Sequence, residues 1–380
     1  MIHDVVVCSL ERWDSVWRRN QYLLAGLLAS DPTLRVLFVE PPVDPVHMAR
    51  SGGRPRAGSG LRRVDGVEGV APGRLWALEP TKWLPRAVGP LADRWLVEAV
   101  VGAGRRLGIT DPVLWVNDPA AAAVLRRTGW PACYDITDDW LRADRAPRVR
   151  ARLEADEALL LERCTEVVVC SPGLATTKGA TRPVRLIPNA VDVAHYRAPA
   201  SRPDDLPDGP CAVYVGTLHH DRIDVDLCVA VARALPDGAH LVLVGPNLLG
   251  EAATDRLGEE GVVCTGPVGH REVPAYLQHA DVLVIPHAVN PFTESLDPIK
   301  AYEYLAVGRP VVATPVPGYG LADTPGVAVA APVAFARAVA DALEGPRLPP
   351  GARPPAVDVP DWQERVAAMA EVLRSVGRET

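Results

Sequence analysis

Short apolar runs alternate with helix-like patterns along most of the chain. In the first half the runs are Asp4–Cys8, Arg35–Glu40, Val113–Val116, Ala132–Ile136 and Glu166–Ser171. Their apolar positions follow one another instead of alternating with polar ones, which is typical of strands buried on both faces of a parallel sheet. A helical pattern follows the first run. The pattern therefore predicts an α/β fold for this half.

The composition turns to Pro, Asp and Gly at Pro199–Pro210, as in a linker, and the alternation then starts again. The runs of the second half are Cys211–Gly216, His240–Gly245, Val262–Gly266, Asp281–Pro286 and Pro310–Pro315. A proline-rich stretch precedes a last helical pattern from Trp362 to about Val376. We expect two doubly wound, Rossmann-like domains, at residues 1–198 and 199–355, and a helix within residues 356–380 that crosses back to the first domain. The Gly- and Arg-rich stretch Arg50–Gly73 is expected to be a mobile loop.

Length, charge and cysteine content limit the classes of protein to which this chain can belong. The chain has 380 residues, enough for two ordinary domains, and a net charge of −7, which argues against a nucleic-acid partner. No apolar run reaches the roughly 18 residues of a membrane-spanning helix. The seven cysteines include no CxxC pair and the N-terminus resembles no signal peptide, so we expect a cytoplasmic protein with reduced thiols.

Glycines end three strand-like runs of the second half: Gly216, Gly245 and Gly266. Glycine at the carboxyl end of a parallel strand lets a ligand approach the backbone closely. A tight turn would explain each glycine singly, but three in series favour one shared crevice. Thr217 and Val268 lie in the same loops and are expected to line the site.

The segment Asp297–Gly308 predicts a short helix with an unusual N-terminus. Asp297 suits the N-cap, Pro298 the first helical position and Gly308 the residue that ends the helix. The expected buried stripe is Ile299, Tyr302, Leu305 and Ala306. The free amides of Ile299 and Lys300 and the lysine charge suit a phosphate, whereas Glu303, one turn further on, suits sugar hydroxyls. The alternative is a surface ion pair between Lys300 and Glu303.

The stretch "DPIKAYEYLAVGRPVVATPVPG" resembles the nucleotide-sugar signature of GT-B glycosyltransferases, in the large retaining group of family four, glycosyltransferase group 1. Within that group it is most similar to the teichuronic-acid-type bacterial branch. Leu186–Tyr196, Tyr214–Leu227 and Tyr134–Trp140 resemble other segments of the family, in the same order along the chain. The resemblance implies a GT-B fold and transfer of a sugar, with retention, from a nucleoside diphosphate sugar to an acceptor hydroxyl. The second domain would hold the donor and the first the acceptor.

The resemblance also implies roles for single residues. Glu303 matches the second of two family glutamates, which binds the donor ribose, while the first falls at Ser295 with Glu294 beside it. The family braces the diphosphate with an Arg and a Lys. We assign this role to Arg222 and Lys300, which would drive departure of the diphosphate; Thr217 stands near the usual Arg position.

Aromatic and charged residues follow the first strand of the first domain. Trp13, Asp14, Arg18 and Arg19 suit stacking and hydrogen bonding to an acceptor, although an aromatic staple with a solvated basic face is the alternative. Three aspartates follow later strands. Asp118 or Asp138 is expected to orient or deprotonate the acceptor hydroxyl, and Asp139 to contact the acceptor. For each aspartate taken singly, a helix cap or a turn is the simpler explanation.

Metal binding is not expected. His219 and His220 lack a partner cluster, and Asp224 and Asp226 open a helix, where aspartate caps the amides. No GxGxxG follows a strand, which argues against a nicotinamide cofactor. We expect a nucleoside diphosphate sugar as substrate, with UDP favoured, and a carbohydrate, lipid-linked or small-metabolite acceptor. Two alternatives stay open: an epimerase or hydrolase on the same fold, and a non-catalytic sugar-nucleotide-binding partner subunit.

Overall fold

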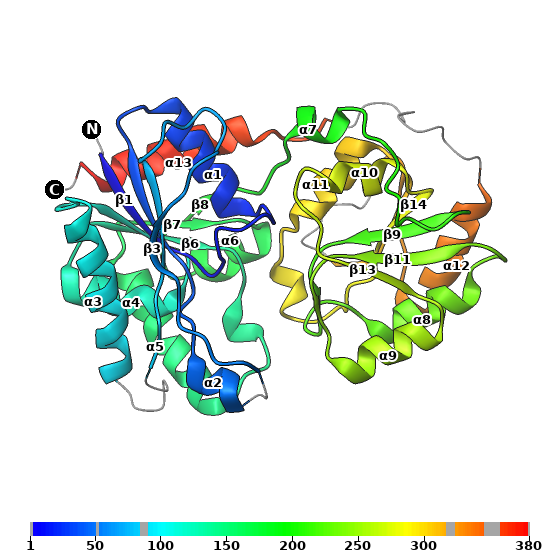
Figure 1. The fold of residues 1–380 in the computed structure, drawn as a ribbon, viewed down its shortest axis with the longest axis horizontal. Helices are drawn as coiled ribbons and strands as arrows, with labels where there is room; N and C mark the ends of the chain where they lie inside the picture. The colour runs from blue at the N-terminus through cyan, green and yellow to red at the C-terminus, as the bar shows by residue number, and fades with distance from the viewer. Residues whose placement is uncertain (1–2, 51–52, 84–89, 317–323, 346–357, 379–380) are drawn as a thin grey trace. The chain divides into compact units, whose positions relative to one another are not determined.

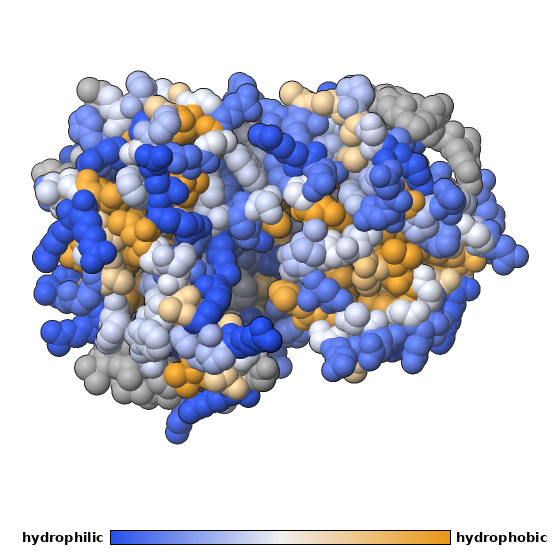
Figure 2. Space-filling model, viewed as in Figure 1, coloured by the Kyte–Doolittle hydropathy of each residue, from blue (hydrophilic) through white to orange (hydrophobic). Residues whose placement is uncertain are grey.

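The computed structural model of the 380-residue chain describes residues 3–50, 53–83, 90–316, 324–345 and 358–378. It divides into two compact units, unit 1 with residues Met1–Pro188 and Gln363–Thr380, and unit 2 with residues Asn189–Trp362. Within the described ranges no helix combines the length and the apolar character needed to cross a bilayer. On the face shown in Figure 2, hydrophilic side chains surround smaller apolar areas in each unit.

Unit 1 is built on one twisted sheet (Figure 1). The strands are β1 (Asp4–Cys8), β2 (Arg35–Val39), β3 (Gly60–Arg63), β4 (Leu75–Glu79), β5 (Val113–Val116), β6 (Ala132–Ile136), β7 (Glu166–Val169) and β8 (Arg185–Leu186). Their order is β3-β4-β2-β1-β5-β6-β7-β8, and every pairing is parallel except that of β3 with β4. The strands predicted from the apolar runs are confirmed, whereas β3, β4 and β8 were not predicted.

Helices cover both faces of this sheet, as its apolar strands require. The elements are α1 (Arg19–Ser30), α2 (Pro45–Arg50), α3 (Pro90–Arg106), α4 (Ala122–Thr128), α5 (Pro147–Arg163), α6 (Pro172–Gly179) and α13 (Trp362–Val376), with the short 3-10 helices η2 (Pro119–Ala121) and η3 (Trp140–Arg142). Val100, Val124 and Leu160 bring α3, α4 and α5 into the core on one face. On the other face α1 and α13 pack so closely that a Cβ on Gly26 would overlap Val366.

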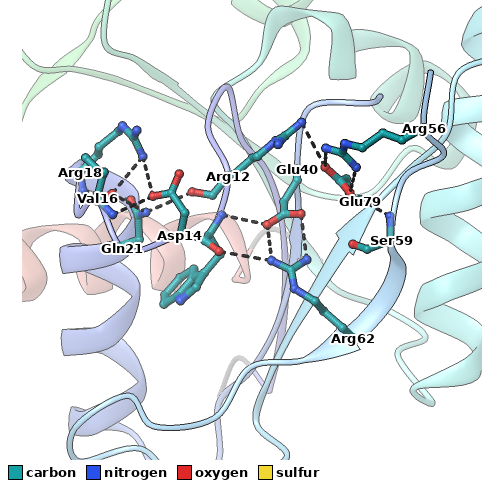
Figure 3. A network of polar contacts seen from close by, with 11 residues as sticks. Arg12, Asp14, Val16, Arg18, Gln21, Glu40, Arg56, Ser59, Arg62 and Glu79 are labelled. Atoms are coloured by element: carbon teal, nitrogen blue, oxygen red, sulfur yellow. Dashed lines mark hydrogen bonds and ion pairs between the residues drawn. The ribbon is translucent and has the colours of Figure 1, made fainter. Parts of the chain in front are cut away.

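The stretch Arg50–Gly73 was expected to be a mobile loop, and within the described residues that expectation is wrong. It contains β3 and is tied to two carboxylates at the ends of neighbouring strands (Figure 3). Arg62 Nη2 lies 2.6 Å from Glu40 Oε1, and Arg56 Nη2 lies 2.8 Å from Glu79 Oε1. Both glutamates are buried, so each needs a charged partner. The arginines that looked like a flexible basic loop supply these partners.

Unit 2 has a second, fully parallel sheet. Its strands are β9 (Cys211–Val215), β11 (His240–Val244), β13 (Val263–Gly266), β14 (Val282–Ile285), β15 (Val311–Ala313) and β16 (Val327–Val329), in the order β13-β11-β9-β14-β15-β16. A separate small parallel pair joins β10 (Leu218–His219) to β12 (Asn247–Leu248). The strands expected after Pro210 are confirmed, and β16 is an addition that the sequence pattern did not indicate.

The helices of unit 2 pack on both faces of its sheet (Figure 1). They are α7 (Val193–Arg197), α8 (Val225–Ala234), α9 (Glu251–Glu259), α10 (Val273–Gln278), α11 (Ile299–Val307) and α12 (Pro332–Glu344), with the 3-10 helix η4 (Thr293–Ser295). Leu227, Leu257 and Phe335 bury α8, α9 and α12 against one face. The α/β architecture of two doubly wound domains predicted from the sequence is therefore present.

The chain passes from unit 1 to unit 2 before the Pro-rich stretch at 199–210, and that stretch lies within unit 2. The reason is local: the backbone N–H of Asn189 donates to Asp297 Oδ2 at 2.6 Å, so residue 189 is already held by unit 2. From Gln363 onward α13 belongs to unit 1. The expected boundary at residues 355 and 356 lies outside the described residues.

Candidate nucleotide-sugar site

The sheet of unit 2 changes direction between β9 and β14. From β9 the order runs to β11 and β13 on one side, and from β14 to β15 and β16 on the other. Ligands of open α/β sheets bind beyond the carboxyl ends of the strands at such a point. Gly216 follows β9 directly, and His287 comes shortly after β14. The candidate site is built around these two positions.

The three strand-ending glycines form one row across neighbouring strands. Gly216 N donates to Val244 O at 2.9 Å, and Gly245 N donates to Gly266 O at 2.8 Å. At Gly245, with φ 139°, a Cβ would overlap the carbonyl of Gly216. At Gly216, with φ 149°, it would lie 2.9 Å from Tyr214 Oη and 3.0 Å from Lys300 Cε. Glycine is thus needed because neighbouring backbones and the Lys300 side chain come close.

Helix α11 begins one residue later than a cap at Asp297 would place it. Pro298 is the N-cap, with φ −76° and ψ 123°. The Asp297 carboxylate accepts from Asn189 N and, at 2.7 Å, from the hydroxyl of Tyr302. The end is as predicted, since Gly308 has φ 75° and its N–H donates to Tyr304 O.

The buried side of α11 is also rotated from the expected stripe. Its buried residues are Ala301, Tyr304, Ala306 and Val307, while Ile299, Tyr302 and Leu305 are half-buried. The fully buried Tyr304 explains the difference, because its hydroxyl accepts from Val215 N at 2.9 Å and so fixes which side faces β9. Ile299 and Lys300 remain in the first turn, whose amides lack partners within the helix.

Two cationic side chains near the end of β9, Lys300 and Arg222, are within electrostatic reach of each other. Lys300 Nζ lies 5.2 Å from the centre of the Tyr214 ring, and the Arg222 guanidinium lies 5.9 Å from the Phe292 ring. The pKa of Lys300 is lowered to about 8, first because the amine is withdrawn from water and second because Arg222 carries the same charge. Two close cations at a helix N-terminus suit an anionic ligand. Thr217, which was predicted to line the site, is half-buried in the loop between β9 and β10.

His287 belongs to this cluster, although the sequence did not single it out. The side chain is buried, and Nε2 lies 3.3 Å from the hydroxyl of Tyr214. The pKa of His287 is held well below its usual value by burial and then by the charges of Lys300 and Arg222. The imidazole is therefore neutral at physiological pH. An antiparallel bridge between Ile223 and His287 ties the loops after β9 and β14 together.

Glu303 lies one turn inward from Lys300 and has a partner that was not predicted. The hydroxyl of Tyr196, on α7, donates to Glu303 Oε1 at 2.6 Å. Burial raises the pKa of Glu303, while the bond from Tyr196 and the charge of Lys300 act in the opposite direction. Lys300 and Glu303 are within electrostatic reach of each other, and neither is a fully exposed surface residue.

The position of the first family glutamate holds a serine. Ser295 is buried, and its hydroxyl donates to Phe292 O at 2.8 Å, while Glu294 beside it is exposed. Val268, predicted for the donor site, is half-buried in the loop after β13.

One group of potential metal ligands occurs among the described residues. His219, His220 and Asp221 place one donor atom each within 4.8 Å of the others. Asp221 Oδ1 lies 3.0 Å from His220 Nε2, so the carboxylate is already within hydrogen-bond distance of an imidazole. Asp224, the other residue considered for a metal, caps α8 and accepts from Leu227 N at 2.9 Å.

The aspartates of unit 1 have separate roles. Asp118 caps η2, with Oδ1 accepting from Ala120 N at 2.9 Å. Asp139 is buried and paired with Lys178 at 2.9 Å and Arg142 at 3.2 Å, so these two cations hold its charge, and its contact with an acceptor stays a prediction. Asp138 is half-buried beside Thr137, whose hydroxyl donates to it at 3.3 Å.

The predicted acceptor residues after β1 also differ in burial, and Figure 3 shows two of them, Asp14 and Arg18. Arg19 is buried and makes two hydrogen bonds of 3.1 Å to the buried carboxylate of Asp135, and its contact with an acceptor stays a prediction. Arg18 stays half-buried and pairs with Asp14 at 3.1 Å. Trp13 packs edge-on against Phe38, with ring centres 5.2 Å apart. Residues Trp13, Asp14 and Arg18 therefore keep surface within reach of solvent.

Comparison with known proteins relates this chain to glycosyltransferases. The family described as Glycosyl transferases group 1 matches residues 209–345. TuaH of Bacillus subtilis (strain 168), assigned to teichuronic acid biosynthesis as a glycosyltransferase, is 25% identical over 222 residues, which cover 54% of this chain and 55% of TuaH. The match thus spans about half the length of that curated relative.

Solved structures resemble the whole chain. Sucrose-phosphate synthase from Thermosynechococcus elongatus superimposes with a TM-score of 0.65 at 19% identity, covering 100% of both chains. Anabaena Alr3699/HepE in complex with UDP-glucose has a TM-score of 0.58 at 15% identity, covering 90% of this chain and 88% of HepE. The chain therefore has the fold of the GT-B glycosyltransferases, and its residues 209–345 match the glycosyltransferase group 1 family.

Proposed function

We propose that the protein transfers a sugar from a nucleoside diphosphate sugar to an acceptor hydroxyl. The observation that carries the proposal is that Lys300 and Arg222 are within electrostatic reach of each other near the end of β9, beside the first turn of α11. Burial and the like charge of Arg222 lower the pKa of Lys300 while Glu303 raises it, and perturbed pKa values of this kind are common at binding sites. The group 1 match over the same residues supports a diphosphate as the ligand.

In this proposal unit 2 binds the donor. The amides of Ile299 and Lys300 and the side chains of Lys300 and Arg222 contact the diphosphate, and the glycine row allows it to approach the backbone. Glu303 accepts hydrogen bonds from ribose hydroxyls. The complex of HepE with UDP-glucose supports a uridine nucleotide as the donor of this protein. No metal is required, because helix amides and basic side chains offset the negative charge.

The chemical step breaks the bond between the anomeric carbon and the diphosphate oxygen. Negative charge then grows on the departing diphosphate, where preorganised donors stabilise the transition state more than the ground state. The acceptor oxygen bonds to the anomeric carbon on the same face and loses its proton, so configuration is retained. Among the aspartates of unit 1, Asp138 remains the candidate to take or orient that proton.

Unit 1 would bind the acceptor, which we expect to be a carbohydrate, a lipid-linked sugar or a small metabolite. Trp13 and Arg18 offer an aromatic surface and a guanidinium for such a molecule. A cytoplasmic location is part of the proposal. It is supported by the seven cysteines, none of which forms a disulfide and six of which are buried.

The proposal is tested by incubating the full chain with UDP-, GDP- and ADP-sugars, with and without a panel of sugar acceptors. We expect one donor to release its nucleoside diphosphate in an acceptor-dependent way, with a new glycoside in equal amount. Release without acceptor would indicate the hydrolase or epimerase alternative. Binding without any turnover would indicate a partner subunit, which Ser295 in place of the first glutamate favours.

A further inference from the structure

Tyr196 approaches Glu303 from a different helix. The hydroxyl is 2.6 Å from Glu303 Oε1, within the range for a bond to an ionised acceptor. The Tyr196 side chain is 1% exposed, so its position is set by packing and not by solvent. A buried hydroxyl needs a hydrogen-bond partner, and on that ground alone Glu303 would serve to satisfy the hydroxyl of Tyr196. The contacts around Tyr196 indicate instead that Tyr196 positions Glu303.

The segment that carries Tyr196 is fixed at several points independent of Glu303. Asp192 caps α7 by accepting from His195 N at 2.9 Å. Gln278 Nε2 donates to the carbonyl of Tyr196 at 3.0 Å, and Arg197 Nε donates to the carbonyl of Ala306 at 3.2 Å. The last of these bonds joins α7 to the helix that bears Glu303. These hydrogen bonds therefore fix the position of the Tyr196 hydroxyl.

Glu303, by contrast, depends on its neighbours for its charge. Burial raises its pKa, and the two influences that favour the carboxylate are the Tyr196 bond and the charge of Lys300. The other titratable groups nearby are His195, on α7, and His270, ahead of α10, whose rings lie 4.4 Å apart. The pKa of His270 is lowered to about 4 by burial and by His195, so it supplies no charge at neutral pH.

We propose that Tyr196 is a positioning residue that holds one oxygen of the Glu303 carboxylate in place so that the carboxylate can accept hydrogen bonds from the donor ribose. This inference rests on the proposed function. An ionised carboxylate has acceptor positions for several donors, so a bond from Tyr196 is compatible with bonds from a ligand. Tyr196 itself acts only through Glu303.

The test is calorimetric binding of UDP, GDP and ADP to the full chain, with pyrophosphate as a probe that lacks a ribose. Tyr196→Phe removes the hydroxyl and keeps the ring. We expect it to weaken binding of the preferred nucleotide about tenfold at pH 7, as for loss of one hydrogen bond to a charged group. Binding of pyrophosphate should not change. The loss should deepen as the pH falls, because Glu303 then takes up a proton more readily.

Two further variants separate positioning from a general packing role. In a Glu303→Gln background, Tyr196→Phe should cost at most about twofold, because two residues that act through one contact are not additive. The matched control is Tyr276→Phe, which removes a tyrosine–carboxylate bond of the same length, 2.6 Å, to Asp205 elsewhere in unit 2. It should bind like the wild type.

The inference is overturned if Tyr196→Phe weakens nucleotide and pyrophosphate binding alike, or if its loss is equal in the wild-type and Glu303→Gln backgrounds. Unchanged nucleotide binding in a folded Tyr196→Phe protein would overturn it as well. Failure of the proposed function looks different. In that case the wild type itself binds none of the three nucleotides, and the positioning role of Tyr196 falls with it.

Discussion

Lys300 Nζ lies 5.2 Å from the centre of the Tyr214 ring, so the lysine of α11 is held over a side chain of strand β9. A cation at this distance is attracted to the face of an aromatic ring. Tyr214 in turn contacts His287, whose Nε2 lies 3.3 Å from the tyrosine hydroxyl. The amine of Lys300, which is proposed to act on the diphosphate, is therefore positioned by a residue of β9. That residue is held in turn by a residue of the chain that follows β14.

Replacing Lys300 with Ala should mainly lower kcat. The charge acts on the departing diphosphate, where it is needed most in the transition state, and loss of one such group costs roughly 100-fold or more in rate. Nucleotide affinity should fall less than kcat does. Steady-state kinetics with circular dichroism as a folding check would measure this. A folded Lys300→Ala enzyme with wild-type kinetics would remove Lys300 from the site.

Affinity for the nucleoside diphosphate should decline as the pH rises past about 8. The pKa of Lys300 in the free protein is lowered to about 8, so the amine is charged below that pH and neutral above it. Calorimetric titrations between about pH 7 and 9 should show the decline in the wild type and lack it in Lys300→Ala. The same decline in both proteins would assign it to another group.

Arg18 and Arg19 should differ sharply when each is replaced with Ala. Arg19→Ala leaves the buried carboxylate of Asp135 without its cation, which typically costs about 3–5 kcal/mol of unfolding free energy. Arg18→Ala removes a partly exposed pair with Asp14 and should cost at most about 1 kcal/mol. Urea unfolding measures both.

If Arg18 binds the acceptor, as proposed, the Arg18→Ala enzyme should also show a raised acceptor KM with nearly unchanged nucleotide affinity. A loss of nucleotide affinity with normal acceptor saturation would move Arg18 to the donor side.

His287 should make the protein less stable in acid. The unfolded chain takes up a proton on this residue below about pH 6.5, but the folded protein resists it because burial and two cations hold the pKa of His287 well below that value. The unfolded state then binds more protons, so stability falls as the pH falls. The contribution is about 2 kcal/mol between pH 7 and 5. His287→Gln should lose correspondingly less stability over that range in urea titrations. An identical acid dependence in both proteins would show that His287 is not the group responsible.

The fold could be predicted from the sequence because its strands are apolar throughout and its linkers change composition. Two of the strands that the pattern missed are marginal by the same measure: β8 consists of two exposed residues, and β3 carries two arginines. Their pairing is decided by tertiary contacts such as Arg62 with Glu40.

The site could be predicted only in part. Lys300, Glu303 and the glycine row were found because a helix start and strand ends leave local signatures. Tyr196 and His287 were missed because their roles depend on partners 107 and 73 positions away in the chain. The sequence also did not indicate that Arg19 and Asp139 are buried beside Asp135 and Lys178, since an exposed and a buried charge look alike in sequence.

The most direct test of a diphosphate site at the end of β9 is nucleotide binding by paired arginine variants of unit 2. Arg222→Ala removes the cation beside Lys300, and Arg233→Ala removes an exposed one that pairs with Glu260. We predict that calorimetry of the full chain detects binding of one nucleoside diphosphate, weakened about tenfold or more by Arg222→Ala and unchanged by Arg233→Ala. Equal affinities in the two variants, or no binding of UDP, GDP or ADP by the wild type, would contradict a diphosphate site at this position.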